Sequence, residues 1–139
     1  MSEEYINAAE VPSEELKVWA ETLTYAEVEE IDSLLKVYQY SGTTAPELLL
    51  LNQKGVEALK GLIQLKREPE QIIDGYSEMS GPERPDAILD KRIKLSQQLE
   101  KSLAVARDKL YDYSDEEITQ FEKEAETLFS SPAEYKEAA

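Results

Sequence analysis

The sequence predicts an all-α fold: a helical bundle built on a long antiparallel α-hairpin, with shorter acidic helices from both termini packed against it. Helix-cap signatures at Ser13, Thr24, Thr44, Ser114 and Ser131 each precede apolar residues at helical spacing. No segment alternates polar and apolar residues in the way a half-buried strand would. The 5 glycines and 6 prolines gather at a few positions, which leaves long stretches free to form helices.

The first two expected helices come from the acidic N-terminal part of the chain. The helix after Ser13 has two glutamates in its first turn, where carboxylates interact favourably with the helix dipole. The helix after Thr24 has Glu27 at the spacing of a capping box, and its apolar periodicity continues to a Ser-Gly pair. Residues 1–10 show no periodicity, so we expect them to be frayed within a single domain that spans 1–139.

The middle of the chain, 45–112, predicts the hairpin, with arms over about 45–79 and 86–112. Pro69 interrupts or kinks the first arm, and a loop rich in glycine and proline over 80–85 reverses the chain. On a helical wheel the apolar residues of the first arm cover about 200°, a wider arc than one neighbouring helix can bury. We therefore expect this arm to lie at the centre of the bundle or to be shared between packed subunits.

Two further helices are expected at the C-terminal end. Ser114 and Glu117 form a second capping box, and Phe121 and Leu128 follow at helical spacing. Ser131 precedes a proline at the first helical position, which is typical of a helix start. These helices are acidic, like those at the N-terminal end.

The residues that recur along the two arms form a candidate oligomer seam. Asn52 lies inside the apolar arc, where a polar residue either fixes register and oligomer state or makes a local cap, and both interpretations stay open. Gly55 costs up to about 1 kcal/mol relative to alanine in a helix, so we expect a neighbouring backbone to approach it closely. The seam comprises Leu48, Leu51, Asn52, Gly55, Leu59, Leu62, Leu89, Ile93, Leu99, Leu103 and Leu110.

The absence of histidine and cysteine removes most catalytic and metal-binding chemistry. Ser-His-acid triads, zinc fingers and iron–sulfur clusters all need one of these residue types. Ser77 lies in a segment similar to a nucleophile elbow, but Met79 replaces the second glycine. The segment from Asp112 imitates a calcium loop, but Glu117 replaces its required glycine. We expect no enzymatic activity, no catalytic residue, no cofactor and no metal site.

The chain carries 15 basic and 30 acidic residues, a net charge of −15, and the charge is unevenly spread. Residues 1–40 hold ten acids and two bases, and residues 114–139 hold eight and two, whereas residues 91–113 hold three acids and six bases. Nucleic acid and anionic membranes attract basic surfaces, so neither is an expected partner. A basic protein could bind a candidate acidic surface formed by Glu27, Glu29, Glu30, Glu116, Glu117, Glu122 and Glu126.

These observations predict a non-catalytic protein–protein interaction or assembly factor of the cytoplasm, a homo-oligomeric subunit of a larger complex. One alternative is an acidic inhibitor that occupies the basic, nucleic-acid-binding cleft of a partner enzyme. A weaker alternative comes from architecture alone, because the expected hairpin resembles the oligomerisation cores of viral small terminase subunits. That resemblance implies a DNA-packaging or regulatory subunit that touches DNA through Lys91, Arg92, Lys94 and Lys101.

Overall fold

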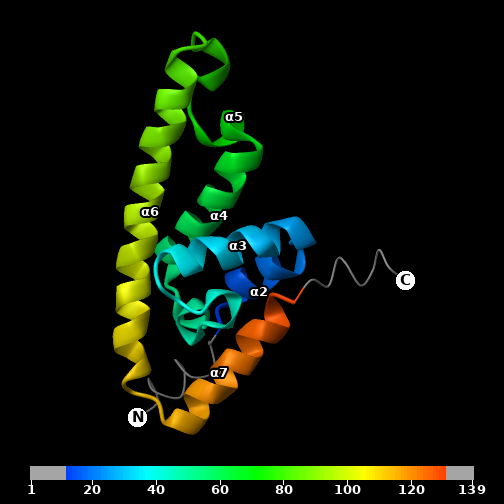
Figure 1. Cartoon of the computed structure of the whole chain (residues 1–139), viewed down its shortest axis with the longest axis vertical. Helices are drawn as coiled ribbons and strands as arrows, with labels where there is room; N and C mark the ends of the chain where they lie inside the picture. The colour runs from blue at the N-terminus through cyan, green and yellow to red at the C-terminus, as the bar shows by residue number, and fades with distance from the viewer. Residues whose placement is uncertain (1–11, 131–139) are drawn as a thin grey trace, which may run out of the picture.

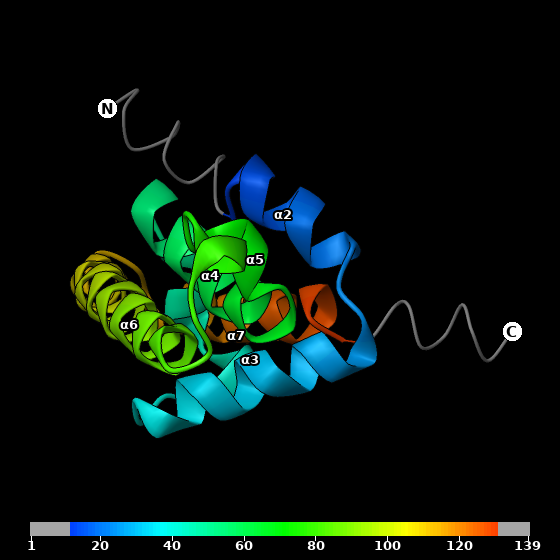
Figure 2. The same cartoon turned by 90° about the horizontal axis from the view of Figure 1, so that it is seen from above.

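The structure, a computed structural model, describes residues 12–130. This part of the chain forms six α-helices and three short 3₁₀ segments and contains no strand, which confirms the all-α prediction (Figure 1). Seen down the long axis, α6 lies at the outer edge of the molecule, with α2 and α3 to either side of α4 (Figure 2). The expected fraying over 1–10 and the helix start at Ser131 lie outside the described residues.

The helices α2 (Glu14–Glu21) and α3 (Tyr25–Val37) begin where their cap signatures predict. The Ser13 hydroxyl accepts a hydrogen bond from the Leu16 amide at 3.2 Å. The Thr24 hydroxyl accepts one from the Glu27 amide at 3.2 Å, and the Thr24 amide donates to the Glu27 carboxylate at 3.0 Å, which completes the capping box. The predicted caps thus satisfy amides that the helix backbone leaves free.

The expected helix start at Thr44 is wrong. The segment forms two 3₁₀ turns instead, η1 (Gly42–Thr44) and η2 (Pro46–Leu50), and the Thr44 hydroxyl donates to the Ser41 carbonyl rather than capping a helix. Residues 45–51 are all buried, because η2 is packed against both α6 and α7. Four consecutive leucines follow Glu47, and an irregular turn enclosed on two sides buries all of them, whereas one helix face would expose some.

The first arm, expected over 45–79, is interrupted at Pro69, as the sequence predicts. It consists of α4 (Gln53–Arg67), α5 (Pro69–Ile72) and η3 (Tyr76–Glu78). Glu68 leaves the helical region, with φ −140° and ψ 70°, because a residue before proline is disfavoured in helical geometry. Gly75 adopts a left-handed φ of 70°, which turns the chain before η3.

The helix α6 (Glu83–Leu110) is the longest element, with 28 residues, and packs along α4. It starts a few residues before 86, where the second arm is expected to begin, and Pro85 lies in its first turn, where a missing amide hydrogen is tolerated. Figure 1 shows α5 and the adjoining part of α6 extending beyond the other helices. We call residues 69–98 the distal arm; none of them is buried.

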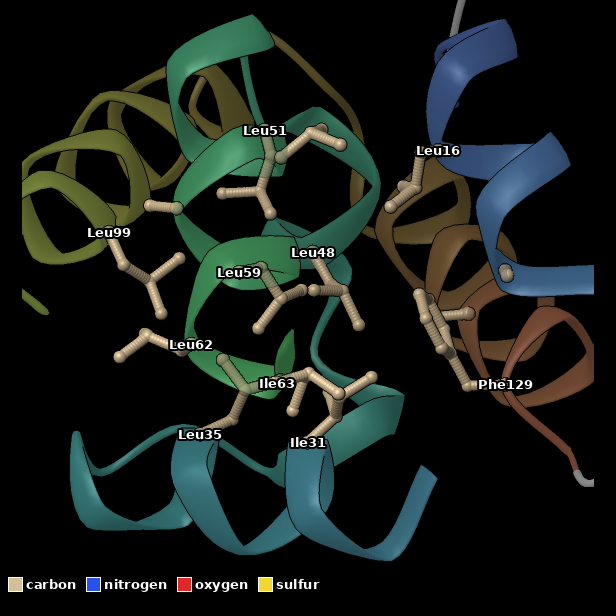
Figure 3. Close-up of a cluster of buried hydrophobic side chains, with 14 of the residues drawn as sticks. Leu16, Ile31, Leu35, Leu48, Leu51, Leu59, Leu62, Ile63, Leu99 and Phe129 are labelled. Atoms are coloured by element: carbon tan, nitrogen blue, oxygen red, sulfur yellow. The ribbon is translucent and has the colours of Figure 1, made fainter. Parts of the chain in front are cut away.

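The core lies below this arm, where α4 meets α3, α6 and η2. Leu59 and Ile63 of α4 lie toward Ile31 and Leu35 of α3, whereas Leu62 points toward Leu99 of α6 (Figure 3). From the other side the core is closed by Leu16 of α2, and by Phe129, which follows α7 (Asp115–Leu128). The wide apolar arc of α4 is therefore buried by several elements of the same chain.

Candidate interaction surface

The structure divides the candidate oligomer seam into a buried set and an exposed set. The buried set lies inside the single subunit, so it cannot form a surface for a partner and must be removed from the seam; it comprises Leu48, Leu51, Gly55, Leu59, Leu62, Leu99 and Leu103. Leu110 is half-buried. Leu89 and Ile93 are 53% and 46% exposed on the distal arm, although both are large apolar residues. These two residues, one helical turn apart, form what we call the apolar stripe.

Asn52 and Gly55 are explained by contacts within the subunit. The Asn52 side chain caps α4 by accepting from the Gly55 amide at 2.9 Å, and it also accepts from the Ser102 hydroxyl of α6 at 2.8 Å. The local-cap interpretation of Asn52 is therefore the one the structure supports. A methyl group on Gly55 would lie 2.6 Å from the Ser102 Cβ, so the close approach expected at this glycine exists. The neighbour is the Ser102 side chain rather than a backbone.

Two of the grooves that border α6 have Arg92 in their walls. The first encloses about 650 Å³ between α3, α4 and α6, and its walls include Leu34, Val37, Ile63 and Arg92. The second encloses about 610 Å³ near the arm's tip, where Arg92 and Leu89 lie among its lining residues. Arg92 lines both, so the grooves adjoin along the helix that carries the apolar stripe. Concave surfaces with exposed apolar residues are typical of interaction sites.

The tip groove also contains an arginine that sequence reasoning missed. The Arg84 guanidinium lies over the Tyr76 ring at 5.1 Å, and its Nη2 donates to the Ser77 carbonyl at 3.3 Å. The contact joins η3 to the first turn of α6, so the two segments that meet at the tip are held together. Ser77 itself lies in the exposed turn η3.

The structure also divides the candidate acidic surface, into carboxylates that make contacts within the fold and carboxylates that are exposed. Glu27 and Glu117 complete capping boxes, Glu27 pairs with Arg67 at 2.8 Å, and Glu30 lies 3.5 Å from Lys66. These three carboxylates stabilise the fold and are not free for a partner. The remaining four are exposed and make no ion pair within residues 12–130; we call Glu29, Glu116, Glu122 and Glu126 the free acidic surface.

Glu47 is a buried carboxylate that the sequence did not single out. Its side chain is 12% exposed, and its Oε2 lies 3.7 Å from Nε of Arg107 on α6. The same guanidinium lies over the Tyr40 ring at 4.6 Å. Partial burial raises the pKa of the Tyr40 hydroxyl, while Arg107 opposes that rise. The cluster links the end of α3, η2 and α6 and holds the core closed at this side.

The pKa of Glu27 makes the unfolding free energy depend on pH. Partial burial alone would raise the pKa of Glu27, but hydrogen bonds from Thr24 and Arg67 outweigh it and lower the pKa. The stabilisation is therefore present above the ordinary glutamate pKa and is lost as the pH falls through the folded value. We expect Glu27→Gln, which keeps the cap geometry, to lower the unfolding free energy by about 0.5–1 kcal/mol at pH 7.

Urea unfolding at pH 7 and pH 3 measures this effect. The difference between the parent chain and Glu27→Gln should shrink from pH 7 to pH 3, because the Glu27 carboxylate takes up a proton as the pH falls. Glu29→Gln is the matched control, at an exposed position two residues further along α3. It should change the unfolding free energy little at either pH. An equal loss for both variants at pH 7 would contradict the role given to Glu27.

Residues 12–130 contain no group of three or more histidine, cysteine or carboxylate side chains that could hold a metal ion. None of the helices in this range combines the length and the apolar character that crossing a membrane requires. No family model, no curated protein and no solved structure matches this chain.

Proposed function

We propose that this protein is a non-catalytic interaction or assembly protein of the cytoplasm, in which α4 and α6 form an antiparallel hairpin whose distal arm binds a protein partner, in the first place another copy. The observation that carries the proposal is the distal arm itself. Residues 83–98 of α6 span about 24 Å and include no fully buried residue, although Leu95 packs against the edge of the core. An arm of this length has little use for the stability of the subunit alone.

The apolar stripe supports the same proposal. Each buried Å² of apolar surface contributes about 25 cal/mol, so covering the stripe and the adjoining grooves would favour association. Leu89 and Ile93 lie four residues apart, which is the spacing by which one helix presents side chains to another. The non-catalytic part of the proposal rests on residue types, because a chain without histidine or cysteine lacks the commonest general base and the commonest activated thiol.

Light scattering on the full chain tests this function. The parent chain at micromolar concentration should show a mass above 15.8 kDa, and the double variant Leu89→Asp with Ile93→Asp should return to 15.8 kDa with an unchanged far-UV spectrum. Val105→Asp is the matched control, because Val105 is 43% exposed on α6 but about 120° around the helix from Ile93. A double variant that keeps the parent mass would show that the arm is not the interface.

A second candidate function is favoured by the free acidic surface. Three of its members, Glu116, Glu122 and Glu126, lie on α7, and an inhibitor of a nucleic-acid-binding enzyme would present carboxylates in this way. Reversing these three to lysine should leave the chain's own mass unchanged and abolish salt-sensitive capture of a basic enzyme. Complexes that survive both the reversal and 0.5 M salt would leave the acidic-inhibitor function without support.

A further inference from the structure

We propose that the partner of the distal arm is a second copy of this chain and that the two α6 helices pair antiparallel, with Ile93 beside the two-fold axis. The inference rests on the proposed self-association and adds the orientation and the register.

One side of α6 next to the stripe carries a sequence of charges with a direction. Asp86, Asp90, Lys94 and Lys101 follow one another at spacings of four, four and seven residues, which places them on one side of the helix; we call them the charged flank. All four are exposed, and none makes an ion pair within residues 12–130. The carboxylates come first along the helix and the ammonium groups follow.

Two copies of this flank have complementary charges only when the two helices run in opposite directions. A two-fold axis that relates antiparallel helices brings the same flank of each copy together, running in opposite directions. Asp86 then meets the partner's Lys101, and Asp90 meets the partner's Lys94. A parallel pair would instead place the flanks of the two copies on opposite sides of the interface, so the carboxylates of one copy would not meet the lysines of the other.

The register of the charges agrees with the position of the stripe. Asp90 and Lys94 are centred on residue 92, and Asp86 and Lys101 are centred between residues 93 and 94. Ile93 therefore lies beside the axis and contacts the partner's Ile93, while Leu89 packs to one side of it. Apolar contact at the centre with ion pairs at the border is the usual anatomy of a protein interface.

Charge-reversal variants of the flank test the pairing. Asp86→Lys with Asp90→Lys makes the flank all basic, and Lys94→Asp with Lys101→Asp makes it all acidic. Each exposed pair contributes little alone, but the two-fold axis produces four pairs per dimer, and reversal turns attraction into repulsion. We expect the dissociation constant of each variant alone to rise at least tenfold, and an equimolar mixture of the two to associate at least as tightly as the parent chain.

The variants change only exposed positions of α6, so far-UV spectra should stay unchanged. Each variant alone associating as the parent does, or a mixture that fails to associate, overturns the antiparallel pairing. If the parent chain is monomeric at every concentration, the proposed function fails with it. If the parent associates and the reversals change nothing, the pairing alone fails and another surface or another partner carries the function.

The cysteine-free chain permits a second, independent measurement. With a short bismaleimide cross-linker, Ile93→Cys should join to itself, because it lies beside the axis. Asp86→Cys and Lys101→Cys should each remain uncrosslinked alone and should join when the two variants are mixed. A link of Asp86→Cys to itself would indicate parallel helices and would overturn the inference. Lys123→Cys on α7 reports random collision and should give no product.

Discussion

Leu103→Asp should unfold the subunit. Leu103 is 1% exposed in the core between α6 and the rest of the bundle, so the variant buries a carboxylate without a partner and removes an apolar contact. Loss of a buried leucine alone typically costs 2–5 kcal/mol, and an unpaired buried charge adds to that loss. We expect the unfolding free energy to fall by more than about 4 kcal/mol, with loss of helical signal in the far-UV spectrum.

Val105→Asp separates this effect from a general effect of charge on α6. Val105 lies two residues further on the same helix but is 43% exposed, so its variant should stay within about 0.5 kcal/mol of the parent. Urea unfolding compares the two. A folded Leu103→Asp chain that has merely lost its partner would contradict the placement of Leu103 inside the subunit, and would return it to the oligomer seam.

Gly55→Ala is expected to destabilise the chain, against the helix propensities. Alanine in α4 would gain up to about 1 kcal/mol over glycine. Its methyl group, however, would lie 2.6 Å from the Ser102 Cβ, and Ser102 is 3% exposed and hydrogen-bonded to Asn52. Forced expansion of a packed site costs typically 1–3 kcal/mol, so we expect the unfolding free energy to fall by about 1–2 kcal/mol.

Gly61→Ala is the matched control on the same helix. A methyl group there meets the flexible end of the Leu95 side chain at 3.1 Å, which can move aside. We expect this variant to be neutral or up to about 1 kcal/mol more stable. Replacing Ser102 by glycine in the Gly55→Ala background should recover most of the loss, because it removes the side chain in conflict. Equal stability of the two single variants would contradict the close packing of α4 on α6.

The elements that depend on neighbours in sequence were predictable. The caps at Ser13, Thr24 and Ser114 each involve residues three positions apart, and all three form as expected. The interruption of the first arm at Pro69 is equally local, because proline restricts the residue before it. Such features need no knowledge of what the helix packs against.

The elements that depend on distant contacts could not be read from the pattern. Helical periodicity marks a face as buried, but it does not say whether the chain's own elements or a second copy covers it. The pattern therefore places Leu48 and Leu51 in the oligomer seam. In the structure both are buried within the subunit, where η2 packs against α6 and α7. Likewise Glu27 and Glu30 were assigned to a partner surface, although Arg67 and Lys66, more than 30 residues away, pair with them.

Two apolar members of the predicted seam remain accessible to a partner. Leu89 and Ile93 belong to the predicted seam, and the structure leaves both exposed, whereas seven other members are buried. We propose an interaction role for the distal arm because these two apolar residues are exposed on the part of α6 that has no buried residue.

The mass of the parent chain in solution tests the central claim most directly. Sedimentation equilibrium on the full chain at low micromolar concentration and moderate salt should give twice 15.8 kDa, with dissociation on dilution. A mass of 15.8 kDa throughout the accessible concentration range would contradict the account, because the distal arm would then have no second copy to cover it.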